Sequence, residues 1–356
     1  MLEFKVLNWN VAGAKYFTIE SDTDKDRFRA DVNKHLQKLV DRHDPHVITL
    51  QEIVEYARPG ELDTSLIDPP AGYTFSPSIL IDSRRHPYVA KWQNAARSGG
   101  WPYNTYFGQG LGVLWRDDLA GFRHFPVWSV PGPTAQPDGK SHVEEVILMS
   151  GLYFGDRDTE PRAAAVSHFV ISNDLRDSHS ELPKALDVFV VNLHLTTLKG
   201  EREGIPQIDG EATVIRSHQV DIILNGIVSR YNKWRNRGYR STGFTAEPNE
   251  GDDFKRYSPI WILCGDFNFT PDSLEYQRVK GANFVDVCPN KGSGSKGSGF
   301  GSLATLTVDY ILVGPKFVSL DPVVVENAVV GNPTPDTTVR VSDHYPLYAT
   351  IPFTPR

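Results

Sequence analysis

Pro259-Ile260-Trp261-Ile262-Leu263-Cys264-Gly265-Asp266-Phe267-Asn268 is the stretch that decides the fold. An apolar run that is short and bounded by proline and glycine is typical of a buried strand. Asp266 and Asn268 come directly after this run, where Asp and Asn also occur as ordinary turn residues. The stretch therefore predicts a buried strand with polar side chains at its end.

Similar apolar runs occur along the whole chain. Further strands are predicted at residues 4–11, 47–50, 111–115, 163–171, 188–195, 307–313 and 345–351, because these runs are rich in β-branched or aromatic residues. Helical spacing of apolar residues predicts helices at residues 26–42 and 212–231. Many strands with few helices predict an α/β (α+β) fold, a four-layered α/β sandwich in which two packed mixed β-sheets are flanked by helices.

Composition excludes several classes of protein. The chain is 40% hydrophobic and 23% charged, as in globular proteins with a sizeable core. Apolar runs are too short to cross a bilayer, and the first strand begins near Phe4, which leaves no room for a signal peptide. These features favour a soluble, cytoplasmic protein. With two cysteines, a disulfide framework is not expected.

Polar residues follow the predicted strands at six places. The ends of strands meet at one rim of a sheet, so groups distant in sequence can gather there around a cation. Any one of them alone is more simply a turn or capping residue, but six together favour a site. The residues are Asn10, Gln51-Glu52, Asn192 with His194, Asp266 with Asn268, Asp309, and Asp343-His344.

As an ordered set, these motifs resemble the endonuclease/exonuclease/phosphatase superfamily, which includes deoxyribonucleases, abasic-site endonucleases and neutral sphingomyelinases. Length alone leaves one domain or two open. The motifs span almost the whole chain and favour a single domain over residues 1–356, with insertions near residues 55–107, 128–160 and 196–255. The motifs are residues 7–13, 50–53, 192–195, 265–268, 308–312 and 342–347.

The resemblance implies Mg²⁺ as the cofactor, with Mn²⁺ as a substitute. Glu52 would be the principal ligand, with Asn10 beside it and Asp343 nearby, because Mg²⁺ prefers oxygen ligands. All-oxygen ligation disfavours zinc.

Catalytic roles follow from the same resemblance. His344 would contact the scissile phosphate or assist proton transfer, with Asp309 holding its far nitrogen. Asp266 would orient or deprotonate the attacking water, Asn268 would bind a phosphoryl oxygen, and His194 would be a second donor. Arg162 resembles a substrate-binding arginine, although a plain surface arginine is nearly as good a reading.

The predicted activity is Mg²⁺-dependent hydrolysis of phosphodiester bonds, first of all by a nuclease acting on DNA or RNA. A phosphodiesterase or phosphatase acting on a phospholipid, as sphingomyelinases do, or on a sugar or inositol phosphate is the alternative, and a non-catalytic member comes third. The net charge of −7 argues weakly against nucleic acid. No protein partner is predicted. Two basic and aromatic segments, residues 84–106 and 230–240, favour nucleic acid because cations hold phosphates and rings stack on bases.

Overall fold

A computed structural model gives the arrangement of the chain. It describes residues 2–11, 22–57, 64–65, 67–82, 106–119, 122–125, 143–149, 162–172, 185–196, 206–229, 259–288, 307–314, 342, 344 and 346–353.

The first sheet joins the two ends of the chain. Its strands are β1 (Leu2–Asn10), β2 (Val47–Ala57), β3 (Thr64–Ser65), β4 (Tyr73–Asp82), β5 (Tyr106–Arg116) and β13 (Leu347–Phe353). Within the described ranges these six strands follow the order β13-β1-β2-β5-β4, and β3 pairs with β2 beside this path. β1 runs parallel to β2 and antiparallel to β13, so the sheet is mixed.

The second sheet comes from the middle and later parts of the chain. Its strands are β6 (Phe122–Phe125), β7 (Val143–Met149), β8 (Arg162–Ser172), β9 (Ala185–His194), β10 (Ile260–Asp266), β11 (Val285–Asp286) and β12 (Asp309–Gly314). Counting only described strands, the order of this seven-stranded sheet is β11-β12-β10-β9-β8-β6, with β7 paired to β8. β9 and β10 are parallel and β12 is antiparallel to β10, so this sheet is mixed too.

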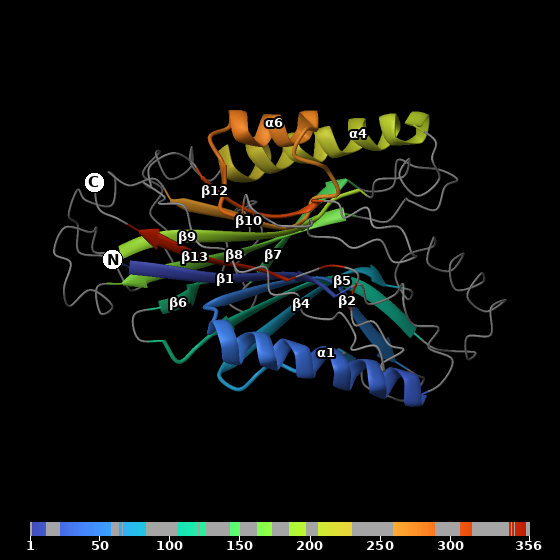
Figure 1. Ribbon diagram of the computed structural model, residues 1–356, viewed down its shortest axis with the longest axis vertical. Coiled ribbons are helices and arrows are strands. Elements are labelled where there is room, and N and C mark those ends of the chain that lie inside the picture. The colour runs from blue at the N-terminus through green and yellow to red at the C-terminus, as the bar shows by residue number, and fades with distance from the viewer. Residues whose placement is uncertain are drawn as a thin grey trace, which may run out of the picture.

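Helices cover the outer face of each sheet. α1 (Asp22–His43) lies against the first sheet. α4 (Pro206–Asp221), its π-helical continuation η2 (Ile222–Val228) and α6 (Leu274–Gly281) lie on the second. The layers run helix, sheet, sheet, helix (Figure 1), which confirms the predicted four-layered sandwich.

Strand alternation divides the core into three clusters. On β10, Ile260, Ile262 and Cys264 face the other sheet, whereas Trp261 and Leu263 face the helices outside. Both faces are therefore buried, which explains the uninterrupted apolar run in the sequence. Burying each large side chain fully contributes roughly 1.5–3 kcal/mol. A third cluster, which includes Val32, Leu36, Leu39, Leu7 and Ile48, joins α1 to the first sheet.

Parts of two predicted insertions are instead strands of the sheets. β4 lies within residues 55–107 and pairs with β5, and β7 lies within residues 128–160 and pairs with β8. Pro77 interrupts the sequence pattern of β4. It is tolerated because β4 ends the described strand order and its backbone need not donate to a second neighbour.

Within the described residues, no helix is both long and apolar enough to span a membrane. Both cysteines, Cys264 and Cys288, are free and buried, which agrees with the expected lack of a disulfide framework. Burial raises the pKa of the Cys264 thiol, so this side chain stays protonated.

Candidate active site

The predicted site residues meet at one end of the interface between the sheets. His194 and Asp309 both pair with Asp266 in the strand register, so the second sheet presents three of them in one row. Asn10 ends β1 and Glu52 lies in β2 of the first sheet. All five side chains are buried, and so are Asn268 and His344.

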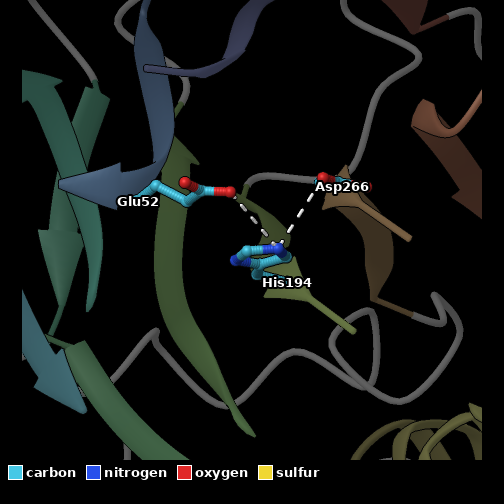
Figure 2. A group of neighbouring side chains, drawn as sticks. All are labelled: Glu52, His194 and Asp266. Atoms are coloured by element: carbon cyan, nitrogen blue, oxygen red, sulfur yellow. Dashed lines mark ion pairs between the residues drawn. The ribbon is translucent and has the colours of Figure 1, made fainter. Parts of the chain in front are cut away.

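A bulge in β2 turns Glu52 into the site. In the pairing of β2 with β5, Gln51 lies opposite Leu111 and Ile53 opposite Gly110, so Glu52 is an extra residue. Its φ of 54° is in the left-handed region, which is strained for a side chain of this kind. The bulge lets Ile53 pack under α1 while Glu52 points toward the second sheet (Figure 2).

Gly265 allows β9 and β10 to approach closely just before Asp266. Its φ is 149°, and a Cβ built on it would lie 1.9 Å from the carbonyl oxygen of Leu193. Beyond it, Asn268 adopts a φ of 50° and its backbone N–H donates to Asp266 Oδ1 over 3.0 Å. The Asn268 side chain donates to the carbonyl oxygen of Leu195 over 3.0 Å. Asparagine accepts the left-handed φ of Asn268 more readily than most residues, whereas the φ of Gly265 suits only glycine.

Glu52, His194 and Asp266 converge from three strands, as Figure 2 shows. His194 Nε2 lies 3.8 Å from Glu52 Oε1 and 3.7 Å from Asp266 Oδ2. The amide of Asn10 bridges the same two carboxylates, because its Nδ2 donates to Glu52 Oε1 over 3.2 Å and to Asp266 Oδ2 over 3.1 Å. One end of the sandwich thus gathers two carboxylates, an amide and an imidazole.

Asp309 and His344 form a second, adjoining group. His344 Nδ1 lies 2.8 Å from Asp309 Oδ2, and its Nε2 lies 3.6 Å from Asp266 Oδ2. A carboxylate at Nδ1 fixes the imidazole tautomer that carries hydrogen on that atom. His344 therefore presents Nε2 to Asp266.

Ser342 holds His344 against the first sheet. The Ser342 hydroxyl donates to the carbonyl oxygen of Asn10 over 2.6 Å and accepts from the His344 backbone N–H over 3.0 Å. Trp9 Nε1 donates to the His344 carbonyl oxygen over 3.3 Å. The sequence predicts no role for Ser342, and its place two residues before a predicted catalytic histidine is the signal that could have suggested one.

The donor atoms suit a divalent cation. Glu52, His194 and Asp266 each offer one ligand atom, all within 4.8 Å of one another, as do Asp266, Asp309 and His344. Two buried carboxylates that face each other across a histidine nitrogen are stabilised by a positive ion between them. The imidazole in each group differs from the all-oxygen ligation that the sequence suggests. Asp343, the third predicted ligand, lies outside the described residues.

Arg162 and the basic and aromatic segments are the remaining predicted contacts with substrate. Arg162 is buried at the start of β8, and strand alternation puts it on the face of Ala164 and Val166, which pack toward η2. Its substrate-binding role stays a prediction. The basic and aromatic segments at residues 84–106 and 230–240 lie outside the described residues except for Tyr106.

Two packed mixed sheets with buried carboxylates, amides and imidazoles at one end of their interface are a fold that occurs among phosphoesterases. The chain belongs to the Endonuclease/Exonuclease/phosphatase family, whose model matches residues 7–344. Members of this family are hydrolases that act on phosphoesters, and enzymes with this fold generally depend on a metal ion. This confirms the resemblance drawn from the motifs.

Solved structures with this fold cover nearly the whole chain at low sequence identity. A Bacteroides thetaiotaomicron endonuclease/exonuclease/phosphatase family protein has a TM-score of 0.54 at 14% identity, over 99% of this chain and 98% of its own. D. rerio TDP2 complexed with a single strand DNA product has a TM-score of 0.52 at 14% identity, over 99% and 100%. A mannosyl-6-phosphatase from Bacteroides thetaiotaomicron has a TM-score of 0.51 at 15% identity, over 98% and 100%. No curated protein matches the sequence.

Proposed function

We propose that this protein hydrolyses phosphodiester bonds with the help of Mg²⁺, and that its substrate is DNA or RNA. The observation that carries the proposal is the meeting of Glu52 from the first sheet with His194 and Asp266 from the second. Phosphodiester hydrolysis needs positive charge near the phosphoryl oxygens, a positioned water and a proton donor for the leaving oxygen. A cation held at Glu52 would supply the charge, Asp266 would position the water, and the neighbouring His344 would supply the proton.

Asn10, Glu52 and Asp343 are the residues that would hold Mg²⁺. Carboxylate and amide oxygens are the ligands that Mg²⁺ prefers, and Mn²⁺ accepts the same donors. The Asn10 NH₂ group faces Glu52 and Asp266, so the Asn10 amide would have to turn over to offer Oδ1 to the cation. When bound, the cation supplies charge that stabilises the phosphoryl oxygens as the P–O bonds are exchanged.

His344 and Asp309 would handle the proton. In hydrolysis a water oxygen forms a bond to phosphorus and gives up a proton, which passes to His344 Nε2 directly or through Asp266, and an ester P–O bond breaks as the protonated His344 gives a proton to the leaving oxygen. With Asp309 at Nδ1, His344 presents Nε2 on the side of Asp266. A gap of 3.6 Å between that nitrogen and Asp266 Oδ2 leaves both atoms within reach of one water.

Asp266, Asn268, His194 and Arg162 complete the proposed site. Asp266 would orient or deprotonate the attacking water, and the Asn268 backbone N–H holds its Oδ1 in place. The Asn268 amide has a second N–H besides the one bonded to Leu195, which suits a phosphoryl oxygen. His194 Nε2 would be a further donor, and Arg162 would bind substrate.

A nucleic acid substrate is supported by sequence. The segments at residues 84–106 and 230–240 interleave cations with aromatic rings, as channels for single strands do. TDP2 was solved with a single strand DNA product, and the similar mannosyl-6-phosphatase shows by its name that the fold also serves a sugar phosphate. One scaffold hosts several substrates, so the substrate must be measured.

A panel of substrates tests the proposal. Plasmid, single-stranded DNA, RNA, sphingomyelin and inositol phosphates are each incubated with the protein and Mg²⁺, with His344→Ala as the control for contaminating enzymes. We expect cleavage of a nucleic acid by the parent protein and loss of that cleavage in the variant. Hydrolysis confined to sphingomyelin or inositol phosphates would replace the nuclease by the alternative phosphodiesterase or phosphatase.

A further inference from the structure

A layer of polar side chains joins the two sheets directly beneath the candidate site. Asn8, Thr49 and Gln51 come from the first sheet and Asn192 from the second, and each is fully buried at 0% exposed. The Asn8 Oδ1 accepts from Thr49 Oγ1 and from Gln51 Nε2, both over 2.8 Å. Gln51 Nε2 also donates to Asn192 Oδ1 over 2.7 Å, across the gap between the sheets.

Backbone carbonyls fix the direction of these hydrogen bonds. Asn192 Nδ2 donates to the carbonyl oxygens of Leu50 over 2.8 Å and Gly112 over 2.9 Å, and a carbonyl can only accept. The Asn192 Oδ1 must therefore face Gln51, and the Gln51 NH₂ group must donate to it. Gln51 donates its two amide hydrogens to Asn192 and Asn8. The orientation of the Gln51 and Asn8 amides therefore follows from that of Asn192.

This polar layer is bonded to the backbone of the first sheet next to the bulge that directs Glu52 into the site. Leu50 pairs with Gly112, and the register shifts between Gln51 and Ile53 just beyond them. Asn192, which holds both carbonyls, lies two residues before His194 in β9. The same side chain thus ties the backbone that carries Glu52 to the strand that carries His194.

Apolar contacts between the sheets do not provide this precision. The inner faces elsewhere are packed by side chains such as Val6, Val190 and Ile262, whose attraction has no direction. Amide hydrogen bonds weaken steeply when distance or angle changes. A sliding movement of one sheet on the other would therefore break the polar layer before it disturbed the apolar one.

We propose that Asn192 and Gln51 are positioning residues, which lock the two sheets so that Glu52, the proposed Mg²⁺ ligand, stays at its observed spacing from His194 and Asp266. This inference rests on the proposed function, because it assigns the residues a role in the affinity of that site for a metal ion. Partners that orient metal ligands typically change metal affinity by about 10- to 100-fold when they are removed.

Binding of Mn²⁺, followed by the electron paramagnetic resonance signal of the free ion, tests the inference without any substrate. We expect Asn192→Leu and Gln51→Met, which keep the approximate size of each side chain, to bind Mn²⁺ about 10- to 100-fold more weakly than the parent. Val190→Ala is the matched control, since it removes an inner-face side chain two residues from Asn192 in the same strand. It should lower the melting temperature and leave Mn²⁺ affinity within about twofold.

The double variant Asn192→Leu/Gln51→Met separates positioning from the cost of burying unpaired polar atoms. Removing both partners should restore part of the melting temperature lost in either single variant, because fewer buried groups stay unsatisfied. Mn²⁺ affinity should stay low. If Asn192→Leu does not fold, Gln51→Met carries the test by itself.

The results can distinguish failure of the positioning role from failure of the proposed metal site. Parent-like affinity in the folded Asn192 and Gln51 variants, or an equal loss in Val190→Ala, overturns the positioning role alone. If the parent protein does not bind Mn²⁺, or if Glu52→Gln binds it as tightly, the proposed metal site is wrong and the inference falls with it.

Discussion

His344 and Asp309 are 2.8 Å apart between Nδ1 and Oδ2, and both are buried. This pair can serve proton transfer, or it can simply be a satisfied polar contact of the core. The two roles differ in what a substitution changes, since catalysis needs the imidazole at the reacting atoms whereas a structural contact contributes only to stability.

Replacing His344 by alanine should reduce turnover at least about a hundredfold, because general acid–base groups typically contribute 10²- to 10⁴-fold. Asp309→Asn keeps the shape of the partner and should lose somewhat less. Rates are measured on whichever substrate the parent cleaves best, with melting temperatures recorded in parallel. The double variant should be far from additive, as for residues that act as one unit. Near-parental turnover in His344→Ala would make the pair structural.

His46 makes stability depend on acid. Burial and the neighbouring charge of Lys5 lower the pKa of His46 from 6.5 to about 4, with Asp44 opposing this effect and Arg116 adding to it. The unfolded chain therefore binds a proton between these values that the folded chain does not. The contribution of His46 to the free energy of unfolding is fully present above about pH 6.5 and is lost as the pH falls toward 4.

This loss should reach at most on the order of 3 kcal/mol at pH 4. It is measured by urea unfolding at pH 7 and pH 4.5 for the parent and for His46→Asn, which removes the titrating ring. The variant should lose less stability on acidification than the parent does. His218→Gln, at an exposed position of α4, is the control, and an equal acid response in the parent and His46→Asn would refute the assignment.

That Glu52 and Asp266 lie close together could be predicted, because each follows an apolar run and matches a motif. Asn192 and Ser342 stand in those motifs too, but their supporting roles could not be predicted. Their hydrogen-bond partners come from distant strands, and the sequence does not show which strands lie side by side.

At the scale of elements, β9 and β10 depend on Gly265. A methyl group there would meet the carbonyl oxygen of Leu193 at 1.9 Å, and the φ of 149° is unfavourable for any other residue. Gly265→Ala should lower the free energy of unfolding by at least about 3 kcal/mol or prevent folding. Gly210→Ala in α4 is the matched control. Its new Cβ would meet nothing within 4 Å, and the change should raise stability by about 0.5–1 kcal/mol.

Urea unfolding of the two glycine variants measures both effects. Similar stabilities would mean that the close approach of β9 and β10 relaxes without cost.

Long or regular elements were predictable and irregular ones were not. The strand at residues 260–264 and the helix at 26–42 agree with β10 and α1, which extend a few residues further. α6 has eight residues, too few for a periodic pattern, although the Ser273 hydroxyl accepts from the Tyr276 backbone N–H as a helix cap. The helix predicted at 212–231 begins earlier and becomes π-helical at Ile222, a change of pitch that apolar spacing does not reveal.

For the molecule as a whole, the inner face changes character along the strands. It is apolar through most of its depth, then amide-lined at Asn8 and Gln51, and it ends in the carboxylates and histidines of the site. Each sheet contributes part of that last layer. The site therefore exists only when both sheets are packed together, and loss of their packing should abolish activity together with the fold.

The proposed hydrolysis requires a divalent cation at this end of the sandwich. Hydrolysis of the best phosphodiester substrate is followed with Mg²⁺, after chelation with excess EDTA, and after Mg²⁺ or Mn²⁺ is restored. We predict that chelation abolishes hydrolysis and that either ion restores it. Glu52→Gln should stay inactive, or should need far more Mg²⁺ than the parent for the same rate. Full hydrolysis by the parent protein in excess chelator would contradict the proposed dependence on a divalent cation.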